Sequence, residues 1–130
     1  MSMNDTLAAA LSKIENAEKL GKHFCQIAPS SNIIKKVLTL MKDYHYIGEY
    51  TESLETKGGV LSLNLIGKLN KCGAIKPRFP ITKKGYEKFE KRYLPAVDFG
   101  HLIISTSQGV LTHQEAKKKN LGGRLIAYFY

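Results

Sequence analysis

Three consecutive hydroxyl residues, Ser105-Thr106-Ser107, and a nearby histidine, His113, are the residues of this chain whose types and spacing could support chemistry. A serine becomes a nucleophile when a histidine takes its proton and an acid orients the imidazole. No G-x-S-x-G motif surrounds these serines, and no acid is placed to orient His113. We therefore expect no enzyme activity. Two interpretations stay open at this point: a hydrogen-bonding surface for a polar partner, or only a turn.

The hydroxyl residues lie between an apolar strand and a short helix. Residues 101–105, HLIIS, predict a buried strand, and Gly109 can adopt backbone angles that other residues avoid. Thr112 and Glu115 have the spacing of a capping box, so a helix is expected over residues 113–119. A loop held at both ends suits a surface that presents donors and acceptors in fixed register, as contacts to the backbone and sugar edges of a folded RNA require.

Side chains alternate along extended backbone, which predicts different roles for the three hydroxyls. Ser105 and Ser107 should point the same way and meet the partner. Thr106 should point the opposite way, where it braces the loop or reaches the other strand. Because Ser107 is further from the buried strand, we expect it to make the more important contact.

The basic residues of the chain are concentrated in its second half. Residues 1–65 contain seven basic and seven acidic residues and are neutral. Residues 66–130 contain thirteen basic and four acidic residues and so carry the whole net charge of +9. So many cations without acidic partners indicate a surface that faces a polyanion. The alternative is a basic surface that serves only solubility.

The segment KKGYEKFEKRYLP, residues 83–95, predicts a short charged helix in which Glu87 and Lys91 are spaced i, i+4. Most of its lysines are expected to be solvated. Tyr86 stands among these cations, and an aromatic ring in such a setting can stack on a base or a sugar. Tyr86 is expected to be partly core, and we keep it in addition as a candidate RNA contact.

Neither a metal site nor a cofactor site is predicted. Cys25 and Cys72 stand far apart, without a CxxC partner or a histidine at ligand spacing, and are interpreted as buried thiols. There is no G-x-x-x-x-G-K-[ST] phosphate loop. No apolar stretch approaches the roughly 20 residues of a membrane span, and the first residues lack the pattern of a signal peptide, so an intracellular protein is expected.

Hydrophobic periodicity predicts an α+β fold of two small domains, with a boundary near Gly67 where glycine and proline interrupt the pattern. The first domain, 1–67, should form an α-β-α-β-β sheet with two helices on one side. The second domain, 68–130, should be basic, RNA-binding and mostly β with short helices. The expected helices are 5–20, 31–44, one within 83–95, and 113–119, and the expected strands are 23–28, 47–55, 59–66, 101–105 and 125–130.

The hydroxyl segment and its surroundings resemble a known family. The pattern Gly100-x-x-Ile103-Ile104-Ser105-Thr106-x-x-Gly109-Val110-Leu111-x-x-x-x-Ala116-Lys117 is similar to the signature of small-subunit ribosomal protein eight, and Gly122-Gly123 matches its later turn. The stretches NDTLAAALSKIENA and APSSNIIKKVLTLMKDYHYIGEY are similar to the family's opening, except that Thr6 replaces a proline and Asn32 stands where lysine is common. KCGAIKPRFPITKKGYEKFEKRYLPA resembles the archaeal and eukaryotic branch.

The resemblance implies a cytoplasmic, ribosomal location and a structural role in the small subunit. It implies primary binding to the central domain of small-subunit ribosomal RNA, beside neighbouring ribosomal proteins, in support of assembly and translation, with no reaction and no cofactor. The alternative is a generic basic nucleic-acid-binding protein. The RNA-contacting residues that the resemblance implies are Ser105, Thr106, Ser107, Gly109, Gly122, Gly123 and Arg124, with Asp5, Thr6, Ser30 and Ser31 in the first domain.

Overall fold

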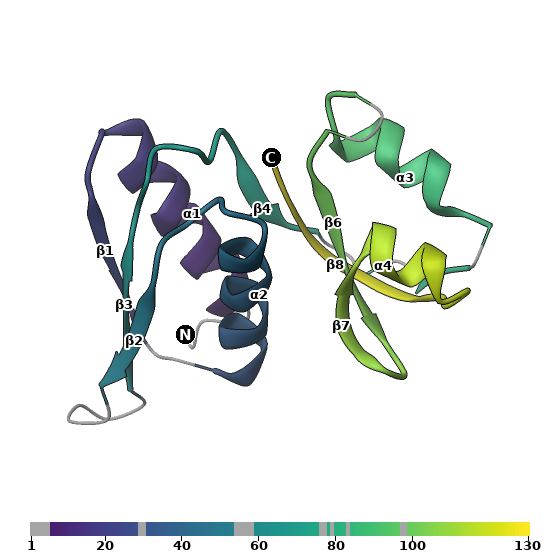
Figure 1. Cartoon of the computed structure of the whole chain (residues 1–130), viewed down its shortest axis with the longest axis horizontal. Helices are drawn as coiled ribbons and strands as arrows, with labels where there is room; N and C mark the ends of the chain where they lie inside the picture. Colours follow the sequence, from purple (N-terminus) through teal and green to yellow (C-terminus); the bar gives the residue numbers. More distant parts are fainter. Residues whose placement is uncertain are drawn as a thin grey trace, which may run out of the picture. The chain divides into compact units, whose positions relative to one another are not determined.

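The computed structural model describes residues 6–28, 31–53, 59–75, 78, 80–82, 84–96 and 99–130. The chain forms two compact units, residues 1–72 and 73–130, whose elements are drawn in Figure 1. The first unit extends a few residues beyond the predicted boundary at Gly67 because Cys72 packs on the first helix. Its amide donates a hydrogen bond to the Glu15 carboxylate at 3.1 Å, and its thiol donates to the Leu11 carbonyl at 3.3 Å.

The first unit is a three-stranded antiparallel sheet with two helices on one face, as predicted. The strand order is β1-β3-β2, and Figure 1 shows both helices on the same side of this sheet. The helices bury apolar residues spaced three and four apart, such as Leu7, Leu11 and Ile14. The elements in chain order are α1 (Thr6–Lys19), β1 (Phe24–Ile27), α2 (Asn32–Asp43), β2 (Tyr50–Ser53) and β3 (Val60–Asn64).

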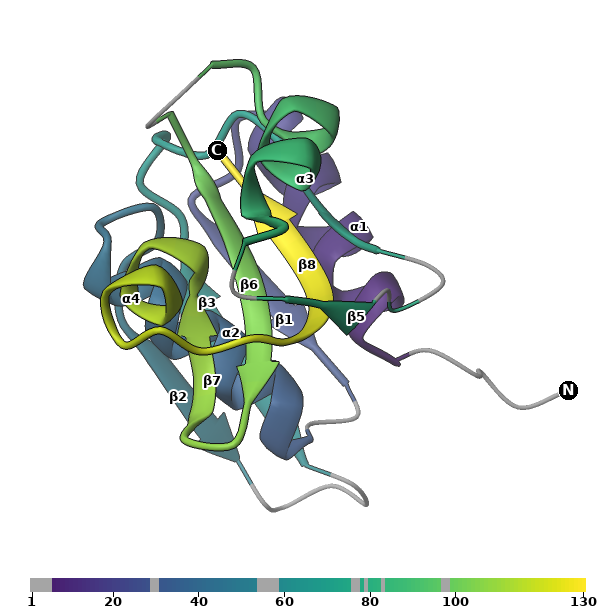
Figure 2. The same ribbon diagram turned by 90° about the vertical axis from the view of Figure 1, so that its right-hand side faces the viewer.

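The second unit is built on a mostly antiparallel sheet with strand order β4-β8-β6-β7, in which β5 also pairs with β8. Both of its helices lie over one face of this sheet, as Figure 2 shows. The core between them contains Leu102 and Ile104 of β6, with Phe89 and Ala116 from the helices. The elements are β4 (Cys72–Ala74), β5 (Pro80–Ile81), α3 (Tyr86–Tyr93), β6 (His101–Thr106), β7 (Gly109–Thr112), α4 (His113–Lys118) and β8 (Gly123–Phe129).

The α+β prediction is confirmed, but three strands were missed. β4 and β5 are three and two residues long and lie in the stretch interrupted by glycine and proline, where no periodicity can develop. β7 was interpreted only as a lead into the following helix. Hydrogen bonding to neighbouring strands, rather than a local pattern, makes these three segments strands.

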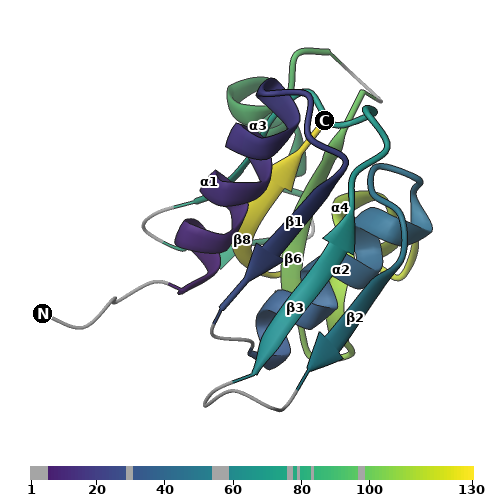
Figure 3. The ribbon, with the colours of Figure 1, turned by 90° about the vertical axis from the view of Figure 1, so that its left-hand side faces the viewer.

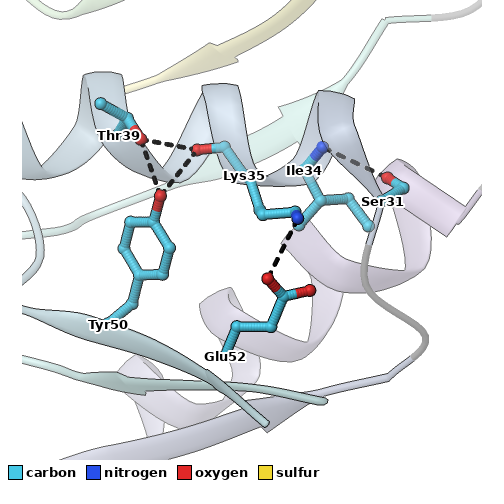
Figure 4. Close-up of polar contacts among 6 residues, drawn as sticks. All are labelled: Ser31, Ile34, Lys35, Thr39, Tyr50 and Glu52. Atoms are coloured by element: carbon cyan, nitrogen blue, oxygen red, sulfur yellow. Dashed lines mark hydrogen bonds and ion pairs between the residues drawn. The ribbon is translucent and has the colours of Figure 1, made fainter. Parts of the chain in front are cut away.

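Polar contacts join α2 to β2 on the helix-covered face of the first sheet. Figure 3 views the opposite face, with the strands in front of the helices, and Figure 4 shows the contacts. The Lys35 ammonium lies 3.1 Å from the Glu52 carboxylate, and the Thr39 hydroxyl lies 2.9 Å from the Tyr50 hydroxyl. Ser31 caps α2 by accepting a hydrogen bond from the Ile34 amide at 3.3 Å. The first two contacts use side chains of β2 to hold the helix, and the third caps its start.

Candidate nucleic-acid interface

The hydroxyl cluster lies on a β-hairpin. Ser105 pairs with Val110 and Thr106 pairs with Gly109, so that residues 107–108 form a two-residue turn. Gly109 has φ +111°, a backbone conformation that favours glycine. The structure therefore corrects the expected loop to a tight hairpin, and the predicted strand continues to Thr106. Two apolar runs separated by four polar residues and a glycine were the signal for this hairpin. We call residues 105–109 the hydroxyl hairpin.

Thr106 braces the hydroxyl hairpin, as predicted. Its hydroxyl donates a hydrogen bond to the Gly109 carbonyl at 2.8 Å and accepts one from the Gln108 amide at 3.1 Å. Ser105 and Ser107 are exposed, whereas Thr106 is half-buried. One hydroxyl thus closes the turn from inside. The predicted alternation along extended backbone does not reach Ser107, because this residue lies in the turn and not in a strand, but Ser107 is exposed as Ser105 is.

The turn that precedes β8 lies against the first strand of the hairpin. Ser105 pairs with Arg124, and the backbone at Gly123 approaches so closely that a Cβ there would lie 2.1 Å from the Ser105 carbonyl oxygen. Only glycine permits this approach. Arg124 is exposed, and its guanidinium donates to the Arg78 carbonyl at 3.2 Å. The fold therefore brings together the two segments of the second unit that were predicted to contact RNA, 105–109 and 122–124.

The capping box at the start of α4 forms as expected. The Thr112 hydroxyl accepts a hydrogen bond from the Glu115 amide at 3.4 Å and donates one to the Glu115 carboxylate at 3.2 Å. Thr112 is fully buried, so the cap also fixes the end of β7. The hydroxyl hairpin is thus anchored to the core through α4.

His113 is a structural residue of this helix. It is 2% exposed, and its Nδ1 accepts a hydrogen bond from the Leu102 amide at 3.0 Å. Its Nε2 lies 3.4 Å from the carboxylate of Glu90, which also pairs with Lys117. Burial lowers the pKa of His113 to about 4, against the smaller raising effect of Glu90. Both ring nitrogens have partners inside the protein, and neither partner is a serine.

The structure corrects the interpretation of Tyr86 as a stacking residue. Its ring is 2% exposed, because Tyr86 begins α3 on the face that packs into the core. Its hydroxyl donates a hydrogen bond to the Leu121 carbonyl at 2.6 Å, and this satisfies the polar end of the buried ring. A base cannot reach this ring.

The contacts predicted for the first domain lie in the first unit. Thr6 is the first residue of α1 and is half-buried. Ser31 uses its hydroxyl to cap α2, so that oxygen already has a partner. The other two predicted contacts, Asp5 and Ser30, lie outside the described residues.

Net charge distinguishes the second unit, which has eleven basic and four acidic residues, from the first, which has nine basic and seven acidic residues. Three lysines of the first unit form ion pairs, Lys19 with Glu15, Lys35 with Glu52 and Lys42 with Glu49, at 3.3, 3.1 and 2.9 Å. The second unit has ion pairs between Lys91 and Glu87 and between Lys117 and Glu90, but it retains a large cationic surface. Its exposed cations in the described part of the chain are Arg78, Lys84, Lys88, Lys91, Arg92, Lys117, Lys118, Lys119 and Arg124.

The two cysteines are buried thiols, as predicted. Burial raises the pKa of Cys72 to about 12 and also raises the pKa of Cys25. Within the described residues, no group of three histidine, cysteine or carboxylate side chains is placed to hold a metal ion. None of the described helices is long and apolar enough to cross a membrane.

A comparison with protein families identifies the family of this chain. The model of the family described as ribosomal protein S8 matches residues 5–130, which is nearly the whole chain. This match confirms the resemblance seen in the sequence signature. The chain belongs to the ribosomal protein S8 family and is a structural protein of the small ribosomal subunit in the cytoplasm, where it binds the central domain of the subunit's RNA beside other ribosomal proteins.

Proposed function

We propose that the second unit makes the sequence-specific contact to ribosomal RNA through the hydroxyl hairpin and the adjoining turn of Gly122, Gly123 and Arg124. One observation carries this proposal: Thr106 closes the hairpin internally, so that Ser105 and Ser107 are held exposed on a rigid support. A group that is ordered before binding loses less conformational entropy when the partner arrives. Such a hairpin is suited to recognition rather than to a mobile, non-specific contact.

The chemistry of the proposed contact divides between neutral and charged groups. Serine hydroxyls both donate and accept hydrogen bonds, which suits base edges and the 2′-hydroxyls of RNA. Gly109 and Gly122 carry no side chain, so the RNA backbone can approach the main chain closely. Arg124 and the lysines at the end of α4 are expected to contact phosphates, which position the protein without reading sequence.

The first unit is expected to play a secondary part in RNA binding. Several of its lysines are neutralised by ion pairs, and the unit as a whole contains nine basic and seven acidic residues. Thr6 and Ser31, with Asp5 and Ser30, are proposed as accessory contacts. Because the Ser31 hydroxyl caps α2, its backbone is the better candidate for such a contact.

We also infer that the protein catalyses no reaction. His113, the histidine considered as a partner for the serines, is buried, and both of its nitrogens face groups of the protein. A general base must reach the proton that it abstracts. The family is one of structural ribosomal proteins, which agrees with this inference.

Two substitutions separate the proposed recognition from electrostatic attraction. Ser107→Ala should weaken binding to a central-domain RNA stem by about 1 to 3 kcal/mol, because an RNA donor or acceptor loses its partner. Binding to a scrambled duplex and the salt dependence should stay nearly unchanged, since no charge is lost. Lys118→Ala should weaken binding to all RNAs alike and reduce the slope of log affinity against log salt by about 0.7 to 0.9, the contribution of one phosphate contact.

Gel-shift titrations of the full-length protein at several salt concentrations measure both effects. Ser12→Ala removes an exposed serine from α1 of the first unit and serves as the matched control. If Ser107→Ala binds the specific stem as tightly as Ser12→Ala while both proteins remain folded, the hairpin is only a turn and the proposal is wrong. Equal affinity of the native protein for duplex DNA would favour a generic nucleic-acid-binding protein.

A further inference from the structure

Four aromatic side chains of the second unit form a continuous row. The rings of Tyr93 and Tyr128 are stacked, with centroids 5.6 Å apart and planes inclined by 28°. Tyr128 and Tyr130 are stacked at 6.3 Å and 24°, and Phe99 packs against Tyr130 at 6.1 Å and 54°. The row therefore joins the last residue of α3, the end of β8 and the segment before β6. We call these four residues the aromatic row.

The two ends of the aromatic row have different environments. Tyr93, Tyr128 and Tyr130 are half-buried and pack against the core of the unit. Phe99, at the far end, is 47% exposed, although burial of a phenylalanine ring is normally favourable. At the opposite end, the guanidinium of Arg92 lies 5.5 Å from the centroid of the Tyr93 ring. The row thus begins at a cation and ends in an exposed ring.

The surroundings of the row favour an anionic partner with flat rings. Residues 73–130 contain eleven basic and four acidic residues. The exposed cations Lys88 and Arg92 lie on α3, the helix that supplies Tyr93, and Lys91 of the same helix pairs with Glu87 at 3.2 Å. An apolar protein partner would meet this charge at a desolvation cost, whereas a nucleic-acid strand brings phosphates that match it. Every nucleobase has a π-face that stacks on an aromatic ring, which is the usual mode of binding to unpaired RNA.

We propose that Phe99, which packs at a tilt against Tyr130, is a stacking platform for an unpaired base of an RNA strand. The strand would place one base on the Phe99 ring and direct its phosphates toward the cations of α3. This contact is separate from the hydroxyl hairpin, since it uses other residues and needs no folded stem. It adds a second RNA-binding surface to the protein and does not depend on the function proposed above.

A fluorescence experiment on the full-length protein tests the platform directly. The chain contains no tryptophan, so Phe99→Trp introduces a single indole at the proposed contact. A short single-stranded oligoadenylate should quench this indole by stacking, and the same oligonucleotide with abasic positions should not, although its phosphates are retained. Absence of quenching by oligoadenylate, or equal quenching by the abasic strand, would overturn the proposal.

Affinity measurements with a matched control complete the test. Phe99→Ala should weaken oligoadenylate binding about 5-fold to 100-fold, the effect of losing one base–aromatic stack, while Phe99→Tyr should retain it. Phe24→Ala removes a ring of similar exposure, 50%, from the first unit and should leave this affinity unchanged. Equal losses in Phe99→Ala and Phe24→Ala, or no loss in Phe99→Ala, would show that no base stacks on Phe99.

The readouts for the two surfaces are distinguishable. Ser107→Ala should leave the quenching of the Phe99→Trp indole by oligoadenylate unchanged, because the hairpin does not take part. Phe99→Ala should likewise leave the affinity for a blunt central-domain stem unchanged. If the stem and oligoadenylate affinities fell together in Phe99→Ala, the ring would be supporting the fold or the hairpin rather than holding a base, and the platform would be refuted.

Discussion

Replacing Gly123 by alanine should force apart the two strands that carry the proposed RNA contact. Gly123 opens β8, where it pairs with Ile81 of β5 on one side and lies beside Ser105 of β6 on the other. A Cβ at this position would lie 2.1 Å from the Ser105 carbonyl oxygen, 2.9 Å from its carbonyl carbon and 3.1 Å from the Ile104 side chain. The first two of these are backbone atoms, which cannot rotate away.

The magnitude follows from this distance. Side-chain Cβ atoms essentially never approach another heavy atom within 3.0 Å, so β8 and β6 would have to separate by about 1 Å. Overpacking of this kind costs about 1 to 3 kcal/mol. In a small domain each kcal/mol lowers the melting temperature by about 4 to 8 °C, so a decrease of roughly 5 to 20 °C is expected. The displaced carbonyl belongs to Ser105, so affinity for the specific RNA stem should fall as well.

Calorimetry or circular dichroism of Gly123→Ala, with gel shifts on the RNA stem, measures both consequences. Gly85→Ala is the control, since Gly85 has φ −95° and the nearest atom to its added Cβ would be the Thr82 hydroxyl at 3.2 Å, with the Thr82 backbone nitrogen and oxygen in ordinary contact at 3.6 and 3.7 Å. This control should change the melting temperature by a few degrees at most, because a side chain can move aside. A Gly123→Ala protein that melts and binds RNA like the Gly85→Ala protein would refute the close-approach argument.

Three further predictions concern the hairpin and its anchor. Thr106→Val keeps the β-branched shape but removes two hydrogen bonds of the hydroxyl hairpin. It should lower the free energy of unfolding in urea by about 1 kcal/mol and weaken stem binding, because Ser107 is held less firmly. Unchanged stem affinity would count against the bracing role of Thr106. Thr112→Ala should destabilise the protein by about 1 kcal/mol through loss of the helix cap, measured in the same way. Burial lowers the pKa of His113 to about 4, below its unfolded value of about 6.5. The stability due to the neutral imidazole should therefore be complete above about pH 6.5. It should fall by up to about 3 kcal/mol as the pH decreases toward 4. His113→Asn retains a side-chain acceptor for the Leu102 amide and should flatten this pH dependence; a profile identical to that of the native protein would show that another group titrates.

The parts of the site that local chemistry specifies were predictable from the sequence. The capping box at Thr112 and Glu115 depends on residues three apart, and it formed with the expected partners. The bracing role of Thr106 also follows from neighbours within three residues, once the segment is known to be extended. The helices α1 and α2 were predicted closely because their apolar stripes repeat over three turns or more.

The short strands were not predictable in this way. β4, β5 and β7 have two to four residues each, too few for a periodic pattern to be read. Their backbone groups find partners in segments distant in sequence, as when Pro80 pairs with Arg124. The hairpin turn at 107–108 was read as a loop because the pairing of Thr106 with Gly109 depends on β7 being a strand.

Residue type and near spacing therefore establish which chemical groups this protein has available: the hydroxyl cluster, the glycine turn, the cationic second half and the family signature. Which of these groups a partner can reach depends on the folded arrangement. Tyr86 and Phe99 are both aromatic residues of the basic second half, yet Tyr86 faces the core at 2% exposure and Phe99 faces solvent at 47%. Gly123 likewise resembles any other turn glycine in the sequence. Only the folded structure shows that a Cβ there would lie 2.1 Å from the Ser105 carbonyl oxygen of β6. Accessibility and close approach depend on the packing of segments far apart in the chain, and no local pattern encodes them.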